Sequence, residues 1–310
     1  MVIKNILVIS PMYKEVQRLI EKEALPYCIH YLAEERLNEA ELDWADALVC
    51  FNLKADIDYS GVKWVHSLGA GVDRFLYGKK WDEKVLLTRT ICSFGQRIAQ
   101  YSLSYILQDL QAHQKFAENE KQKNWQPYTP GLLSEQKLMI YGTGEIGQTV
   151  AKVLSSFGVK VYGVSLSGTK KDYFHEVLSI DTHYTRLNEM NFVINTLPLT
   201  EQTYTLFNKD IFQHTRNIGF INVGRGASLD EIALLEALAA NQVRFAVLDV
   251  FSQEPLPKEH PFWEHPSIVI TPHISAVTTP EEGVACFIET LNNIEENKPL
   301  RNIVNPSKGY

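Results

Sequence analysis

The chain has 310 residues, of which 45% are hydrophobic and 22% charged, and its formal net charge is −7. At roughly 150 residues per domain this length predicts two domains, and the composition excludes a chain that is disordered throughout. The acidic balance disfavours nucleic acid or an anionic membrane surface as the main partner, while a local basic pocket for a small anion stays compatible with it.

The cysteines and the apolar runs indicate a cytoplasmic protein. Cys28, Cys50, Cys92 and Cys286 form no CxxC pair and match neither a zinc site nor a disulfide framework. We therefore expect no bound metal and a reducing, cytoplasmic compartment. The N-terminal apolar run is short and interrupted by polar residues, which favours a strand over a signal peptide. No stretch approaches the roughly 18 apolar residues that a membrane span needs.

The first part of the chain alternates β-branched runs with helical patterns. Strands are predicted at residues 6–9, 47–50 and 64–67, and an amphipathic helix at residues 15–23. This βαβ alternation predicts a parallel sheet that is covered by helices.

A second βα series follows a long helix, which we predict over residues 96–119. Six parallel strands are expected in this series, at residues 137–141, 159–164, 192–196, 219–223, 245–249 and 268–271. After them, Thr279-Pro280-Glu281-Glu282 has the N-cap, proline and capping glutamate of a helix start.

These elements predict an α/β protein with two Rossmann-like, doubly wound parallel sheets. The predicted boundaries give a first domain of residues 1–97 plus 276–310, with a second domain of residues 98–275 inserted into it.

A GxGxxG fingerprint joins the strand at residues 137–141 to a helical pattern. It consists of Gly142, Thr143, Gly144, Glu145, Ile146 and Gly147. Its first glycine permits a tight turn, its second lets the backbone approach a pyrophosphate, and its third lets helix and strand pack closely. The helix N-terminus then offers free N–H groups to phosphate. The alternative is a glycine turn in some other βαβ unit.

The end of the next strand favours NADP over NAD. An acidic residue there would bind the ribose 2′-hydroxyl, but no carboxylate occurs before Asp172. The hydroxyls of Ser165, Ser167 and Thr169 and the nearby Lys170 and Lys171 suit a 2′-phosphate instead. A solvated loop whose lysines touch nothing is the alternative.

Three later strands are each followed by a residue that carries chemistry: Arg225, Glu254 and His273. In an open parallel sheet these ends meet at one edge. Reduction of a 2-oxo acid needs a proton donor, which histidine provides, and a cation for the carboxylate, which arginine grips with a planar fork. A carboxylate beside the histidine would hold its tautomer. We expect His273 as general acid/base, Glu254 as its partner and Arg225 as substrate anchor. Taken singly, each has a structural alternative: a loop histidine, a turn glutamate and a helix-capping arginine.

Two further segments each carry a local prediction. The segment of Leu68, Gly69, Ala70 and Gly71 is predicted to bind the substrate carboxylate through backbone N–H groups, facing Arg225 across an interdomain cleft. A plain strand-to-helix turn is its alternative. Ser228-x-x-Glu231 predicts a capping box for the helix after Arg225.

Six motifs together resemble the D-isomer-specific 2-hydroxyacid dehydrogenase family. They are SLGAGVD (67–73), YGTGEIG (141–147), NTLPLTEQT (195–203), NVGRGASLDE (222–231), LDVFSQEPLP (248–257) and TPHISAVT (271–278). They span nearly the whole chain, and the segment HPFWEHPSIVITPH and the ending SKGY look most like the bacterial glyoxylate/hydroxypyruvate reductase A branch.

The resemblance implies NAD(P)H-dependent reduction of small 2-oxo acids, glyoxylate to glycolate and hydroxypyruvate to glycerate, by a homodimer built on the nucleotide domain. It implies a flavodoxin-like substrate-binding domain of residues 1–97 plus 276–310, into which a dinucleotide-binding domain of residues 98–275 is inserted. It implies Arg225, Glu254 and His273 as the catalytic residues. It implies further cofactor contacts at Thr196, Leu197, Pro198, Val223, Gly224, Asp249 and Ser275, with Asp249 reaching the nicotinamide carboxamide.

Leu166 stands where that branch typically has an arginine. Two other functions stay open: an NAD-dependent D-lactate or D-glycerate dehydrogenase, and a non-catalytic nucleotide-sensing protein on the same fold.

Overall fold

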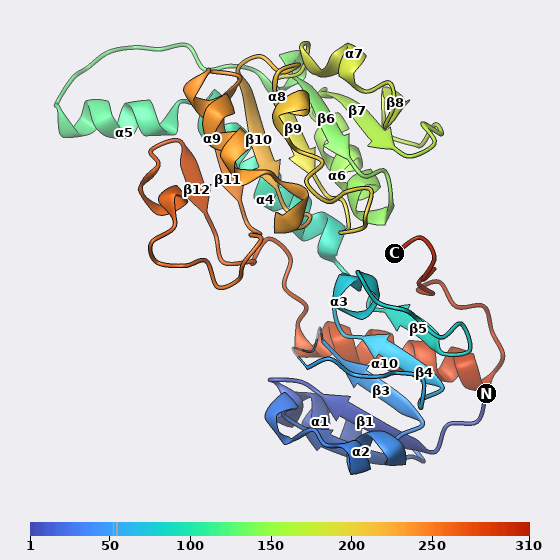
Figure 1. Ribbon diagram of the computed structural model, residues 1–310. Helices are drawn as coiled ribbons and strands as arrows, with labels where there is room; N and C mark the ends of the chain where they lie inside the picture. The colour runs from blue at the N-terminus through green and yellow to red at the C-terminus, as the bar shows by residue number, and fades with distance from the viewer. Residues whose placement is uncertain (52, 54) are drawn as a thin grey trace. The chain divides into compact units, whose positions relative to one another are not determined.

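The computed structural model describes residues 1–51, 53 and 55–310 and divides the chain into two compact units (Figure 1). Unit 1 consists of Met1–Phe94 and Thr278–Tyr310, and unit 2 is Gly95–Val277. The chain therefore leaves unit 1, builds unit 2 and returns. The assignment of a substrate-binding and a dinucleotide-binding role to the two parts stays a prediction.

Unit 1 holds a five-stranded parallel sheet in the order β2-β1-β3-β4-β5, which is the flavodoxin-like order. Its strands are β1 (Asn5–Ile9), β2 (Cys28–Leu32), β3 (Ala47–Cys50), β4 (Trp64–Ser67) and β5 (Leu86–Arg89). The three strands predicted here are confirmed. The prediction missed β2 and β5, the two edge strands. In β2 only Leu32 is buried, and the strand lacks a continuous apolar run.

Helices cover both faces of this sheet: α1 (Tyr13–Glu21), α2 (Glu39–Trp44), α3 (Asp73–Leu76) and α10 (Pro280–Glu295). Alternate residues of β1 face opposite layers, because side chains alternate along a strand. Ile6 and Val8 pack with α1 and α10, whereas Leu7 and Ile9 pack in the other cluster with Phe75 of α3. The predicted capping box of Thr279 and Glu282 is confirmed at the start of α10.

Unit 2 holds a seven-stranded parallel sheet in the order β12-β11-β10-β9-β6-β7-β8. Its strands are β6 (Lys137–Tyr141), β7 (Lys160–Ser165), β8 (Glu176–Ser179), β9 (Phe192–Asn195), β10 (Ile218–Asn222), β11 (Val243–Leu248) and β12 (Ile268–Ile270). Renumbered from β6, this is the Rossmann order extended by one strand. The six predicted strands are present, but the count of six is wrong: β8 is a short, partly exposed edge strand without an apolar run.

The helices of unit 2 are α4 (Phe94–Leu110), α5 (His113–Lys121), α6 (Glu145–Ser155), α7 (Tyr184–Leu187), α8 (Lys209–Phe212) and α9 (Glu231–Ala239). Buried residues of α4 and α6 share one core cluster with Leu138 and Ile140 of β6. Met139 and Tyr141 face the other cluster, with α7, α8 and α9. Both faces of the sheet are thus covered, and the predicted fold class of two doubly wound α/β domains is confirmed.

The single long helix predicted for residues 96–119 is wrong. Ala112 adopts a left-handed conformation with φ +52°, which ends α4 and separates it from α5. The apolar periodicity ends at Leu110, and no residue of α5 is buried. Figure 1 shows α5 and the segment after it standing away from the sheet of unit 2. Among the described residues, no helix combines the length and the apolarity that crossing a bilayer requires.

His66 is a fully buried histidine in β4, next to the predicted carboxylate-binding segment. Its Nδ1 lies 2.8 Å from Thr88 Oγ1 and its Nε2 lies 3.4 Å from Thr90 Oγ1. Burial lowers the pKa of His66 to about 3. An unfolded histidine titrates near 6.5, so the folded state binds this proton less tightly than the unfolded state.

This difference predicts an acid-sensitive unit 1. The contribution of His66 to stability is fully present above the unfolded pKa and declines as pH falls from about 6.5 toward 3. At pH 5 the loss is about 2 kcal/mol. In urea unfolding at pH 7 and pH 5, His66→Gln should remove this part of the pH dependence, and the exposed His113→Gln should not. An unchanged pH dependence in His66→Gln would contradict the prediction.

Candidate active site

The three glycines of the turn after β6 differ in the space that a side chain would have at each position. Gly142 has φ +100°, and a Cβ there would lie 2.6 Å from Thr196 Oγ1. A Cβ at Gly147 would overlap the carbonyl group of Gly142. At Gly144, the N-cap of α6, a Cβ would meet nothing within 4 Å. The chain itself therefore requires Gly142 and Gly147, and the open space beside Gly144 fits a phosphate at the helix N-terminus.

The segment after β7 is a turn of hydroxyl groups. Ser165 Oγ accepts a hydrogen bond from Gly168 N at 3.2 Å, and the hydroxyls of Ser167 and Thr169 lie 2.7 Å apart. Leu166 is half exposed, and Lys170 and Lys171 are exposed. Donors and positive charge, without a carboxylate among residues 165–171, suit a 2′-phosphate better than a bare 2′-hydroxyl.

Asn195 and Asn222 end the buried strands β9 and β10 and hold the loops that follow. Asn195 Nδ2 donates to Asn222 Oδ1 at 2.9 Å and to Ser228 Oγ at 2.7 Å, and Asn195 Oδ1 accepts from Leu197 N. Both asparagines are fully buried. Neither of them was predicted from the sequence to have a role. The available signal was an amide residue at the end of two otherwise apolar strands, where a buried polar group must find partners.

Arg225 is held between two glycines that allow close approach of other backbone segments. A Cβ at Gly224 would lie 2.6 Å from Leu197 O, and a Cβ at Gly226 would overlap the backbone of Phe251. Ser228 Oγ donates to Arg225 O at 2.6 Å. The arginine loop is therefore locked against the loops that follow β9 and β11.

The predicted capping box of Ser228 and Glu231 is wrong. Asp230 caps α9, accepting hydrogen bonds from Ile232 N and Ala233 N at 3.0 Å. Ser228 cannot serve as the cap because it lies in a 3-10 turn, Gly226–Ser228, with its hydroxyl directed to Arg225 O. Glu231 instead lies 3.1 Å from His260 Nε2.

His273 and Glu254 form the predicted pair. His273 Nδ1 lies 2.9 Å from Glu254 Oε2, and Glu254 Oε1 accepts from Phe251 N at 2.9 Å. Burial raises the pKa of Glu254, but the hydrogen bonds from His273 and Phe251 and the charges of His273 and Arg225 outweigh it, so the net pKa lies below its usual value. Glu254 is therefore ionised at neutral pH and favours a proton on Nδ1. Nε2 is then the ring nitrogen left to face a substrate.

Asp249 and Ser275 also meet in this region. Asp249 is fully buried, and its Oδ2 accepts from Ser275 N at 2.9 Å. Arg225, Glu254, His273, Asp249 and the glycine turn all follow strand ends of the one parallel sheet in unit 2. Thr196 lies with them, because its Oγ1 donates to Tyr141 O at 2.8 Å, directly before Gly142.

The other predicted substrate segment, Leu68 to Gly71, belongs to unit 1. Leu68 is buried, and its side chain would lie 3.3 Å from a Cβ added at Gly283 of α10, so it offers only its backbone to a ligand. Ser67 Oγ accepts from Gly69 N at 3.3 Å. Neither Gly69 nor Gly71 has a positive φ. The segment starts as a side-chain-stabilised turn after β4.

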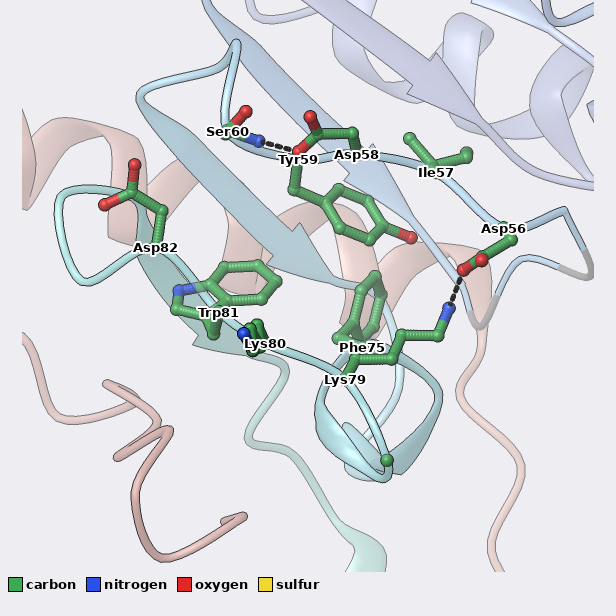
Figure 2. Close-up of a pocket in the computed structure, with 11 residues that line it drawn as sticks. Asp56, Ile57, Asp58, Tyr59, Ser60, Phe75, Lys79, Lys80, Trp81 and Asp82 are labelled. Atoms are coloured by element: carbon green, nitrogen blue, oxygen red, sulfur yellow. Dashed lines mark hydrogen bonds and ion pairs between the residues drawn. The ribbon is translucent and has the colours of Figure 1, made fainter.

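Unit 1 also has a cavity of about 720 Å³ (Figure 2). The rings of Tyr59, Phe75 and Trp81 lie in its wall, and Lys79 pairs with Asp56 at 2.6 Å. Among the described residues that line it, none is a predicted site residue. The described lining of this cavity therefore consists of residues other than those predicted to bind substrate or cofactor.

The fold and the glycine turn of unit 2 define a dinucleotide-binding α/β protein. Residues 103–275 match the family model described as D-isomer specific 2-hydroxyacid dehydrogenase, NAD binding domain. A protein named glyoxylate/hydroxypyruvate reductase A from Serratia proteamaculans is 32% identical over 256 residues, which cover 80% of this chain and 82% of that protein. The chain thus belongs to the D-isomer specific 2-hydroxyacid dehydrogenase family, and the predicted family is confirmed.

Two solved structures are similar to this chain over nearly its whole length. A D-isomer specific 2-hydroxyacid dehydrogenase family protein from Aeromonas salmonicida has a TM-score of 0.84 at 30% identity and covers 98% of this chain and 100% of its own. An NADPH-dependent glyoxylate/hydroxypyruvate reductase from Sinorhizobium meliloti, solved with NADP and sulfate, has a TM-score of 0.86 at 26% identity. It covers 99% of this chain and 100% of its own.

The contrast among the glycines predicts separable effects on folding and binding. Gly144→Ala should leave the free energy of unfolding within about 0.5 kcal/mol of wild type and weaken NADPH binding by about tenfold or more, because the added methyl occupies the phosphate space. Gly147→Ala should instead destabilise unit 2 by about 2 kcal/mol or more, because the methyl overlaps backbone. Urea unfolding and NADPH fluorescence titration check both, and tight NADPH binding by a folded Gly144→Ala protein would contradict the first.

Proposed function

We propose that this protein is an NADPH-dependent reductase of small 2-oxo acids, converting glyoxylate to glycolate and hydroxypyruvate to glycerate. The observation that carries the proposal is the 2.9 Å pair of His273 Nδ1 and Glu254 Oε2, with the charge of Arg225 close enough to lower the pKa of Glu254. The relatives named above support the substrate class, and the S. meliloti structure with NADP supports the cofactor.

A bound reduced nicotinamide supplies the hydride that the substrate carbon takes up. Arg225 grips the substrate carboxylate with its planar guanidinium and polarises the carbonyl. His273 gives the proton on Nε2 to the carbonyl oxygen, so that one hydride and one proton turn the 2-oxo acid into a 2-hydroxy acid. Glu254 keeps the proton on Nδ1 and stabilises the protonated ring.

The cofactor is proposed to lie along the strand ends of unit 2. Residues 98–275 form the dinucleotide-binding domain, with the pyrophosphate on the turn from Gly142 to Gly147 and the 2′-phosphate at Ser165 and Ser167. The remaining proposed contacts are Thr196, Leu197, Pro198, Val223, Gly224, Asp249 and Ser275.

Residues 1–97 and 276–310 are proposed as the substrate-binding domain. The backbone N–H groups of residues 68–71 would bind the substrate carboxylate. The support for this role is a turn that exposes backbone after β4, with Gly69, Ala70 and Gly71 only partly buried.

Rates with a panel of 2-oxo acids, each with NADH and NADPH, test the proposal. We expect fastest NADPH oxidation with glyoxylate or hydroxypyruvate. Arg225→Lys should lower kcat/KM for these acids by about 10- to 100-fold, because a lysine loses the bidentate grip. Arg216→Lys, at an exposed arginine, is the matched control and should change little.

Two results would overturn it. Faster turnover of D-lactate or D-glycerate with NAD would favour the NAD-linked dehydrogenase. Tight NADPH binding without oxidation by any 2-oxo acid would favour a nucleotide sensor.

The cofactor preference is tested at Ser165. Ser165→Asp should weaken NADPH binding by about tenfold or more and improve NADH binding, because a carboxylate repels the 2′-phosphate and accepts from the 2′-hydroxyl. Asparagine has nearly the shape of aspartate without its charge, so the NADPH affinity of Ser165→Asn should lie between those of wild type and Ser165→Asp. Unchanged NADPH affinity in the aspartate variant, measured by fluorescence titration, would remove Ser165 from the 2′-phosphate site.

We also propose a homodimer through the nucleotide-binding domain, in the cytoplasm. Trp125 is 97% exposed, and Phe116, Tyr128 and Leu132 are exposed in the same segment; this exposed apolar surface supports the proposal, because a second copy would cover it. A monomer mass in sedimentation at micromolar concentration would contradict the dimer. None of the four cysteines, all of which the structure describes, forms a disulfide, which supports the proposed reducing compartment.

A further inference from the structure

A chain of three polar side chains runs from α4 to the loop that carries His273. The Tyr101 hydroxyl lies 2.6 Å from Thr271 Oγ1, and Thr271 Oγ1 lies 2.6 Å from Asp249 Oδ1. Tyr101 comes from the middle of α4, Asp249 follows β11, and Thr271 follows β12. These hydrogen bonds therefore join three segments that are distant in the sequence.

The chemistry of the groups fixes the direction of these hydrogen bonds. A carboxylate only accepts, so the single hydroxyl proton of Thr271 goes to Asp249. Thr271 Oγ1 must then accept from Tyr101, and the tyrosine hydroxyl is the donor. Each link strengthens the next, since a hydroxyl that accepts a hydrogen bond becomes a better donor.

Asp249 uses this support to hold the backbone on both sides of His273. Its carbonyl oxygen accepts from His273 N at 2.8 Å. Its carboxylate accepts from Ile274 N at 2.8 Å and from Ser275 N at 2.9 Å. The residue enclosed by these bonds, His273, has φ +55°, a left-handed conformation that is unfavourable for a residue with a side chain. The hydrogen bonds to Asp249 offset that cost and direct the imidazole toward Glu254.

We propose that Tyr101 and Thr271 are positioning residues of the active site, which act on His273 through Asp249. The proposal rests on the proposed function, in which His273 is the proton donor. Loss of either hydroxyl breaks the chain that supports Asp249, and the loop relaxes from its left-handed turn. The ring of Tyr101 also packs on Tyr105 at 5.0 Å between centroids, so a packing role must be separated from the hydrogen bond.

Paired substitutions at Thr271 make that separation. Thr271→Val keeps the shape and loses the hydroxyl, whereas Thr271→Ser keeps the hydroxyl. With glyoxylate and NADPH we expect Thr271→Val to lower kcat by about 10- to 100-fold with KM within about threefold, and Thr271→Ser to stay within about threefold of wild type. Tyr101→Phe keeps the packing ring and should lower kcat by about fivefold.

Two further variants complete the design. If the side chains act in series, Tyr101→Phe should add little to Thr271→Val in the double variant. Thr215→Val is the matched control: Thr215 is buried, and its hydroxyl donates to Phe212 O at 2.7 Å. Thr215 precedes β10 and so lies at the amino ends of the parallel strands. The His273 loop follows β12 and lies at their carboxyl ends. Thr215→Val should change neither kcat nor KM.

Amide hydrogen exchange gives a readout that does not depend on turnover. The amides of Ile274 and Ser275 should exchange about tenfold faster or more in Thr271→Val than in wild type, Thr271→Ser or Thr215→Val. Unchanged exchange in an active protein, or fully additive losses of kcat in the double variant, would overturn the positioning role. If the wild-type protein failed to oxidise NADPH with every 2-oxo acid tested, the proposed function would be overturned instead. The exchange result would still test whether Thr271 supports the loop of His273 through Asp249.

Discussion

The buried carboxylate of Asp249 is the constraint on which the rest of the site depends. A fully buried carboxylate is stable only when its oxygens are hydrogen-bonded, and here two backbone N–H groups and one hydroxyl satisfy it. Those partners fix the loop of His273, whose ring meets Glu254. Glu254 accepts from the amide of Phe251, whose backbone leaves no room for a side chain at Gly226. The three predicted catalytic side chains are thus linked by backbone contacts, so a shift in one loop is transmitted to the others.

Parallel topology brings these loops to the same sheet edge, but it does not align them. The alignment comes from polar groups that the apolar strands end on. Asn195 and Asn222 each end a strand that is buried on both faces, where an amide has no water to bond with. They bond to one another, and Asn222 Nδ2 donates to Arg225 O. These hydrogen bonds offset the cost of burying two amide side chains, and they also fix the arginine loop. The same principle operates at Asp249, one strand further along the sheet.

The sequence predicts best what depends on local patterns. An apolar run predicts strand β6, and the glycine spacing after it predicts a turn that other backbone approaches closely. Both predictions need only a few adjacent residues. The errors arise where one particular contact, or the backbone conformation of a single residue, decides the local structure. Ser228 looks like a helix cap, but its hydroxyl bonds to Arg225 O, and Asp230 takes its place. The helix of residues 96–119 looks continuous until Ala112 takes a left-handed conformation. Tyr101 and Thr271 lie 170 residues apart, and no local pattern pairs them.

An acidic chain that binds two anionic ligands needs positive potential only where the ligands bind. The formal charge of −7 is a sum over the whole sequence, and at physiological ionic strength a charge further than about 8 Å from the ligand is largely screened. The groups nearest the proposed anions are the opposite in kind: the N-terminus of α6, the exposed Lys170 and Lys171, and the guanidinium of Arg225. Acidic groups lie there too: Glu145 in the first turn of α6, and Glu254, whose pKa is held below its usual value because hydrogen bonds from His273 and Phe251 and nearby positive charges outweigh the effect of burial. The carboxylate of Glu254 therefore stays ionised beside His273, and the guanidinium of Arg225 is the cation that offsets its repulsion of the proposed substrate carboxylate.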